Sequence, residues 1–163
     1  MEKFQLLREE SLKNYQIADH ILTVTYPLIK DTKLLLGVTD NMFLALNNAM
    51  SSILHHERIF KLVPIFEDTF ESKFTIFRYK CVPRYKIGRE YIDLIQEIQE
   101  IIYLHKKSPI EFKRKDRFII CTKNYQMKGI TTNQLKIYLQ KTKEFLKIAQ
   151  DITSSKERFF KNQ

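Results

Sequence analysis

One segment of the sequence, from Lys106 to Lys128, combines cationic side chains with aromatic rings. Its Lys and Arg residues are Lys106, Lys107, Lys113, Arg114, Lys115, Arg117, Lys123 and Lys128. The aromatic residues Phe112, Phe118 and Tyr125 lie among them. Cations suit a phosphate backbone, and planar rings can stack on unpaired bases. The segment therefore predicts a surface that binds RNA or another polyanion, although the same pattern also fits a solvated turn.

The positive charge of the chain is concentrated in its last third. The 163 residues carry a net charge of +9. Residues 1–100 contain 13 Lys and Arg against 14 Asp and Glu, whereas residues 101–163 contain 15 against 5. This asymmetry favours an anionic partner, although it can also serve solubility alone.

The histidines and cysteines have no spacing typical of a metal or catalytic site. His55, His56 and Glu57 are adjacent, and neighbours on a helix point about 100° apart, so we expect half-exposed residues rather than ligands of one ion. Cys81 and Cys121 are forty residues apart, and this spacing matches no metal or redox motif. We therefore expect two buried free thiols. Three isolated glycines do not form a phosphate-binding loop. We therefore expect no metal, no cofactor and no catalytic residue, which favours a non-enzymatic role.

The N-terminal residues indicate where the chain acts. They are charged from the second position and lack the apolar core of a signal peptide. No stretch approaches the roughly 18 apolar residues that a membrane span needs. We expect a cytoplasmic protein with no membrane contact.

Helices are the elements that must position these residues. Hydrophobic residues make up 44% of the chain, and it contains only three glycines and four prolines, a composition that favours long helices. Apolar residues recur at a helical period, which predicts helices over about 4–26, 31–63, 65–81, 89–105 and 131–152. The third of these carries a phenylalanine stripe that we expect to be core: Phe66, Phe70, Phe74 and Phe77.

Prolines and capping residues predict where the helices begin and end. Pro27 ends the first predicted helix at about Tyr26, and Pro83 closes the third, because proline lacks an N–H and restricts the preceding residue. The segment 108–111, Ser-Pro-Ile-Glu, matches a capping box with proline at the first helical position. Its amides would then add to an anion site. Thr131 and Gln134 give a second capping-box match.

A short β-hairpin is predicted just before the last helix. The run RFIICTK favours a strand, NYQ a turn and MKGI a return strand, which places the hairpin at about 117–130. With no repeat or linker, we expect one domain over 1–163. The predicted architecture is an up-and-down bundle of four to five long helices with this hairpin inserted.

The first two predicted helices resemble those of the HEPN bundles, especially in IADHILTVTYPLIKD and ALNNAMSSILHHERIF. These small prokaryotic domains often pair with nucleotidyltransferases or act in RNA-directed defence. The whole chain also resembles an uncharacterised archaeal family with a segment such as HKKSPIEFKRKD before a hairpin and a last helix. The ribonuclease members carry an arginine four to six residues before a histidine. No histidine of this chain has one, so no catalytic residue is carried over: His20, His55, His56 and His105.

Three hypotheses follow for the function of the chain. The first is a non-enzymatic helical module that binds RNA or another polyanion through the segment from Lys106 to Lys128. The second is a homodimeric or protein-partner module that uses exposed parts of the phenylalanine-rich helix and pairs with a nucleotidyltransferase. The third is a HEPN-type ribonuclease without the usual arginine and histidine motif.

Overall fold

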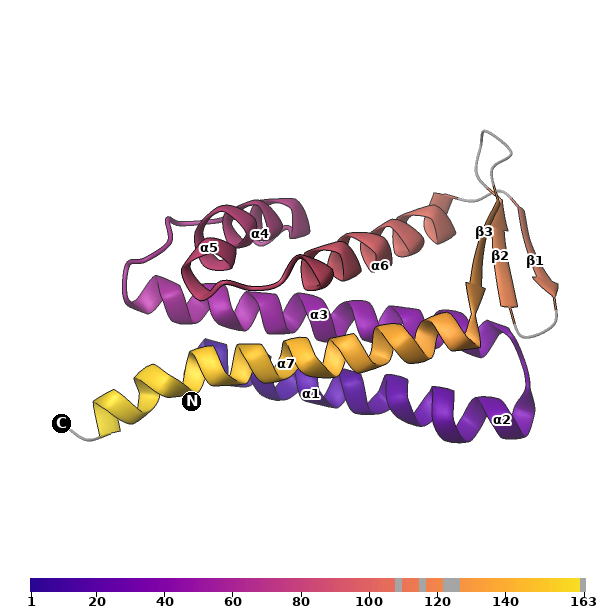
Figure 1. Cartoon of the computed structure of the whole chain (residues 1–163), viewed down its shortest axis with the longest axis horizontal. Helices are drawn as coiled ribbons and strands as arrows, with labels where there is room; N and C mark the ends of the chain where they lie inside the picture. Colours follow the sequence, from indigo (N-terminus) through magenta and orange to yellow (C-terminus); the bar gives the residue numbers. More distant parts are fainter. Residues whose placement is uncertain (108–109, 115–116, 122–126, 162–163) are drawn as a thin grey trace.

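The computed structural model describes residues 1–107, 110–114, 117–121 and 127–161, and it is mainly helical (Figure 1). The helical elements before the sheet are α1 (Lys3–His20), η1 (Ile21–Thr25), α2 (Tyr26–Ile29), α3 (Lys33–Ile59), α4 (Phe70–Ile76), η2 (Phe77–Cys81), α5 (Val82–Tyr85) and α6 (Arg89–Lys107). Three strands follow, β1 (Ile110–Arg114), β2 (Arg117–Cys121) and β3 (Met127–Thr131), and then α7 (Thr132–Lys161). The predicted fold class, mainly α with a small hairpin before the last helix, is confirmed.

Helix α3 lies at the centre of the bundle. The rod formed by α1, η1 and α2 runs antiparallel to it, and α6 and α7 pack on its other sides (Figure 1). Because several helices surround α3, most of its circumference is buried. Its largest fully buried side chains are Leu35, Met42, Leu46, Met50, Ile53 and Leu54.

The phenylalanine stripe contributes to the core through its second half. Phe77 is fully buried and meets Phe145 of α7 edge to face, with ring centroids 5.9 Å apart. Phe74 is 9% exposed, and Phe70 is partly buried and stacks on it at 5.2 Å. Phe66, also partly buried, precedes the helix. The expectation that this stripe is core is confirmed most fully for Phe74 and Phe77.

The predicted helix ends at the two prolines are wrong. Each proline is preceded by a π-helical segment, η1 before Pro27 and η2 before Pro83, and the helix continues through both. The wider i→i+5 turn leaves room where a proline ring would clash with a carbonyl of a regular α-helix. The two helical rods end instead at Lys30 and Lys86, in the left-handed conformation with φ of 55° and 53°.

The third helix begins later than predicted. It starts at Phe70 rather than near Pro64, because Thr69 acts as N-cap and its Oγ1 accepts a hydrogen bond from the amide of Ser72 at 3.2 Å. The preceding residues form a connection from the end of α3. Part of this connection lines a surface hollow.

The three strands form an antiparallel sheet in the order β1-β2-β3. The predicted hairpin corresponds to β2 and β3. The helix predicted to start at Ser108 is wrong, because the residues that would form its first turns, Ile110–Arg114, are strand β1, paired with β2. Ser108 and Pro109 lie outside the described residues. Cross-strand pairing, such as Phe112 with Ile119, outweighs a local capping pattern here.

The second predicted helix start is confirmed at α7. Thr131 Oγ1 accepts the amide hydrogen bond of Gln134 at 3.1 Å. The Gln134 side chain donates to the Tyr138 hydroxyl rather than back to Thr131. Neither α7 nor any other helix in the described ranges has a stretch long and apolar enough to cross a membrane.

Candidate functional site

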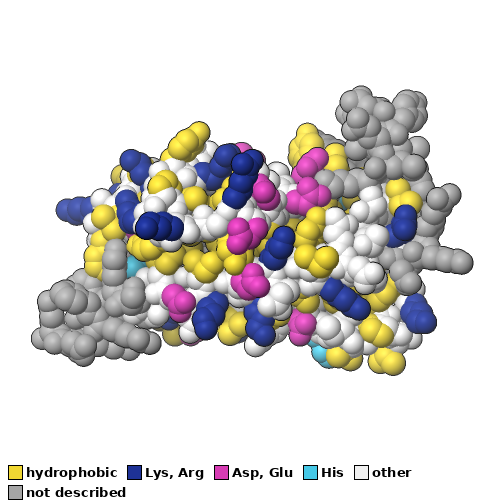
Figure 2. Space-filling model, viewed as in Figure 1, with side chains coloured by type: hydrophobic (Ala, Val, Ile, Leu, Met, Phe, Trp, Pro, Cys, Tyr) yellow, Lys and Arg dark blue, Asp and Glu magenta, His cyan; other side chains and the backbone are white. Residues whose placement is uncertain are grey.

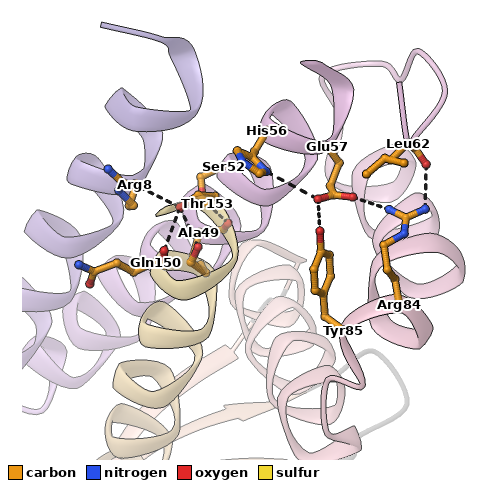
Figure 3. Close-up of polar contacts among 11 residues, drawn as sticks. Arg8, Ala49, Ser52, His56, Glu57, Leu62, Arg84, Tyr85, Gln150 and Thr153 are labelled. Atoms are coloured by element: carbon orange, nitrogen blue, oxygen red, sulfur yellow. Dashed lines mark hydrogen bonds and ion pairs between the residues drawn. The ribbon is translucent and has the colours of Figure 1, made fainter. Parts of the chain in front are cut away.

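A buried carboxylate lies near the end of α3. Glu57 has no exposed surface, and both of its oxygens are hydrogen-bonded from α5. Arg84 Nη1 donates to Oε2, and the Tyr85 hydroxyl donates to Oε1 (Figure 3). A carboxylate without water needs such donors, because desolvation of a charge costs several kcal/mol. The sequence-based expectation of a half-exposed Glu57 is therefore wrong, and we call Glu57, Arg84 and Tyr85 together the buried anchor.

Arg84 also reaches the connection that follows α3. Its Nη2 donates to the carbonyl oxygen of Leu62 at 3.1 Å (Figure 3). The chain turns at Lys61, whose φ is 57°, and the amide of Leu62 donates back to the carbonyl of Glu57 at 3.0 Å. This is the hydrogen-bonding pattern that ends helices with a left-handed residue. Arg84 thus ties α5 to the turn that ends α3.

His56 is buried beside this carboxylate, whereas His55 is partly exposed as predicted. The His56 ring lies between Phe4, with centroids 5.0 Å apart, and Phe60, at 5.1 Å. Its Nδ1 lies 3.6 Å from Glu57 Oε1, beyond hydrogen-bonding distance. The half-exposed environment expected for His56 is wrong, because the N-terminus of α1 covers this face of α3.

The groups around Glu57 are poorly suited to nucleophilic or base chemistry. Burial, and next the charge of Glu57, raise the pKa of the Cys81 thiol to about 12, although Arg84 opposes the shift. Burial, and then the hydrogen bond to Glu57, raise the pKa of Tyr85. Both groups therefore stay protonated at neutral pH, whereas a nucleophilic cysteine needs a lowered pKa. The buried anchor positions Arg84 rather than activating a nucleophile.

Exposed cations lie at the end of α3 and along η2 and α5, next to the buried anchor in sequence. We define the basic corner by these side chains, of which Arg84 also belongs to the anchor: Arg58, Lys61, Arg78, Lys80, Arg84 and Lys86. Tyr79, between Arg78 and Lys80 in sequence, has 73% of its surface exposed. Figure 2 shows Lys and Arg side chains gathered over the end of the molecule formed by α4 and α5, with acidic side chains further along the same face. Cations around an exposed ring form a surface suited to polyanions.

The basic corner contains a hollow of about 670 Å³. Three cations line it: Arg58 and Lys61 from the end of α3, and Lys80 from η2. Its other walls are apolar and include Ile59, Val63 and Pro64. Every described residue along the hollow is therefore either basic or apolar.

The segment singled out from the sequence is only partly described by the structure. Lys106 lies in the last turn of α6, and Arg117 is the first residue of β2. Both side chains are exposed. The side chains of the others lie outside the described part: Lys107, Lys113, Arg114, Lys115, Lys123 and Lys128. Because Ile110–Arg114 is a strand, no helix begins at Ser108. The helix amides that were expected to add to an anion site there are therefore absent.

The two basic regions lie at opposite ends of α3 (Figure 1). The basic corner adjoins the end of α3, and the sheet adjoins its beginning. Sequence reasoning missed the basic corner because the charges of residues 1–100 were averaged. Residues 78–89 alone contain five cations and no acid: Arg78, Lys80, Arg84, Lys86 and Arg89. A shorter window would have found this run.

Comparison with known proteins adds no family to these observations. The chain matched no protein-family model, no curated protein and no solved structure. The resemblance to HEPN bundles therefore stays a prediction. Among the described residues, no group of three or more His, Cys, Asp or Glu side chains is arranged to hold a metal ion.

Proposed function

We propose that this chain binds RNA or another polyanion through the basic corner. The single observation that carries the proposal is the grouping of Arg58, Lys61 and Lys80 around one hollow, with Tyr79, the residue before Lys80, exposed. Lys and Arg neutralise backbone phosphates, and an exposed ring stacks on an unpaired base. An unpaired strand fits this combination better than a duplex, in which the bases are already stacked.

The buried anchor supports this role by keeping the local charge positive. Glu57 is the nearest acidic residue in sequence to Arg58 and Lys61, but it lies inside the protein with Arg84 and Tyr85 bound to it. In the part of the chain that the structure describes, no carboxylate pairs with Arg58, Lys61 or Lys80. Their charges therefore face solvent and are free to attract phosphates.

The segment from Lys106 to Lys128 forms the second contact in this proposal. Within it, the register of the sheet pairs Arg114 with Arg117. Helix α3 has 27 residues, which corresponds to about 40 Å at 1.5 Å per residue. A stacked strand of about twelve nucleotides, at the duplex rise of about 3.4 Å each, spans this length, and an extended strand needs fewer.

The test measures binding of a 20-nucleotide single-stranded RNA by fluorescence anisotropy over a range of salt concentrations. In the test variant, Arg58, Lys61 and Lys80 are replaced by asparagine, which tolerates the left-handed conformation of Lys61. The matched control removes the same charge from exposed positions of α7: Lys136, Lys143 and Lys147. For a single strand, removing one cation that binds a phosphate lowers the log–log salt slope by roughly 0.7.

We expect the test variant to bind more weakly, with a slope reduced by about 2, and the control to differ little from the unchanged protein. Equal weakening in both variants would mean that only net charge matters. In that case, or if the unchanged protein does not bind RNA, the proposal fails.

A second candidate function is a protein-interaction module, and one observation favours it. The rod of α1 and α2 exposes several large apolar side chains: Leu6 (52%), Ile17 (47%), Val24 (45%), Leu28 (81%) and Ile29 (64%). Exposed apolar groups along one helix are typical of a contact surface. Sedimentation without RNA tests for a homodimer, which would have twice the chain mass of 19.6 kDa.

A further inference from the structure

The hollow in the basic corner combines two kinds of surface. Part of its lining is basic, with Arg58, Lys61 and Lys80 contributed by segments about twenty residues apart in sequence. The rest of the lining is apolar and includes Ile59, which is 50% exposed, and Pro64. A ligand that matches both kinds of lining carries a negative group and a flat or apolar group.

The walls of this hollow are held in place by contacts behind them. Lys61 is fixed by the turn at the end of α3, where its amide donates to the carbonyl of Arg58 at 3.1 Å. Leu62 is held by Arg84. Val63, 4% exposed, packs into the core. The cations therefore project from a fixed backbone, and binding does not require a loop to be ordered first.

The size of the hollow exceeds that of a phosphate group. Its volume of about 670 Å³ falls within the range of about 300–1,000 Å³ typical of small-molecule sites. A phosphate group displaces only a few water volumes of about 30 Å³ each. A phosphate at the three cations would leave the apolar lining without a contact.

We propose that this hollow binds one phosphorylated nucleoside unit of the RNA strand. Its phosphate contacts Arg58, Lys61 and Lys80, and its sugar and base lie against Ile59 and Pro64. Arg58 can bind two phosphate oxygens at once, and the lysines act as point charges. This inference deepens the proposed function and rests on it, since the hollow is part of the basic corner.

The test uses the full chain and three probes: AMP, adenosine and inorganic phosphate. Binding is measured by NMR titration of the amides at Lys61 and Leu62, with affinities from the shift changes. We expect AMP to bind more tightly than either phosphate or adenosine. If adenosine or inorganic phosphate binds as tightly as AMP, the assignment to a nucleotide is overturned.

Matched variants locate the probe. Lys61→Asn and Lys80→Asn each remove a cation that lines the hollow, and Lys30→Asn removes an exposed cation outside the basic corner. Asparagine is chosen because it tolerates the left-handed conformation of Lys61 and Lys30. The first two should weaken AMP binding about tenfold, as expected when one charge-assisted hydrogen bond is removed. Equal weakening by Lys30→Asn would overturn the proposed location.

A displacement experiment distinguishes this inference from the proposed function. A short oligoadenylate RNA should displace AMP from the amides of Lys61 and Leu62. If RNA binds the protein without displacing AMP, or AMP does not bind at all, the hollow is not a site for an RNA nucleotide, although RNA binding stands. If AMP binds but RNA does not, the proposed function fails first.

Discussion

The guanidinium of Arg84 lies against the fully buried carboxylate of Glu57, yet Arg84 itself is about one-third exposed. The two partners are therefore unequal. If Arg84 is removed, a charge is left inside the protein without its strongest donor. If the charge of Glu57 is removed, Arg84 can still be hydrated from its exposed side.

This inequality predicts different costs for the two single substitutions. Arg84→Met should lower the free energy of unfolding by about 3–5 kcal/mol, the range for a buried pair broken from one side. Glu57→Gln should cost only about 1–3 kcal/mol, because a neutral amide remains to accept hydrogen bonds. Urea unfolding of both variants measures the difference. Equal costs would show that hydration of Arg84 from its exposed side does not reduce the destabilisation caused by Glu57→Gln.

A pH dependence follows from the buried thiol of Cys81. Its pKa is raised from an ordinary 9.0 to about 12 by burial, and next by the charge of Glu57. Above pH 9 the unfolded chain releases this proton and the folded chain keeps it, so stability falls as pH rises. Between pH 9 and 12 the loss is about 1.4 kcal/mol per pH unit.

The control for this effect is Cys81→Ala. The variant lacks the thiol, so its free energy of unfolding should fall less steeply above pH 9 than that of the unchanged protein. The comparison is made on the pH slope, since the variant also loses packing. Identical slopes from pH 8 to 10.5 would mean that the Cys81 thiol ionises in the folded state as it does in the unfolded chain.

Tyr79 provides a test of stacking that does not alter charge. Its side chain is 73% exposed, so Tyr79→Ala should change stability by less than about 0.5 kcal/mol. The same substitution should weaken binding of single-stranded RNA by about 1–3 kcal/mol if a base stacks on the ring. Tyr79→Phe keeps the ring and should bind like the unchanged protein. A loss of affinity in both variants would point to the hydroxyl instead.

The left-handed residue at the end of the first helical rod predicts a stabilising substitution. Lys30 has φ of 55° and is exposed. Glycine adopts this conformation without strain, so Lys30→Gly should raise the free energy of unfolding by about 0.5–1 kcal/mol. Lys13→Gly, at an exposed position inside α1, is the control and should lower it by about 1 kcal/mol. Thermal or urea unfolding measures both.

A separate prediction concerns the segment from Lys106 to Lys128. Replacing Lys113, Arg114 and Lys115 by serine should reduce the salt slope for a 20-nucleotide RNA, which is long enough to reach both basic regions. A 4-nucleotide RNA is too short to span them even when extended and should show a smaller change, since the basic corner alone can hold it. An unchanged slope with the longer RNA would leave this segment as a solvated turn.

Sequence periodicity predicted the long helices because each buries one apolar stripe, and that pattern is local. The same local reasoning failed at Ser108, where a capping pattern was read as a helix start. Residues Ile110–Arg114 form a strand because the residues of β2 pair with them in an antiparallel register. Those partners come from residues further along the chain, and a capping motif contains no information about them.

The buried anchor could not be predicted for a similar reason. Glu57 is an acid on a helix, and in the sequence it looks like a solvated residue. Its partners Arg84 and Tyr85 lie 27 and 28 residues later, beyond a connection and two helical elements. Only the packing of α5 against α3 brings them together. The run of cations at residues 78–89 was visible in the sequence, but its position around a hollow was not.

The π-helical segment η2 has a consequence for how this surface could change by insertion or deletion. A π turn contains one residue more than the α-helical pattern requires. Deletion of one residue within Phe77–Cys81 would restore a regular helix and leave the phase of α5 almost unchanged, because the wider turn had absorbed the extra residue. Arg84 and Tyr85 would still face Glu57, but Pro83 would meet a carbonyl in the preceding turn. The surplus residue thus makes room for the proline, and the anion-facing surface depends on that room.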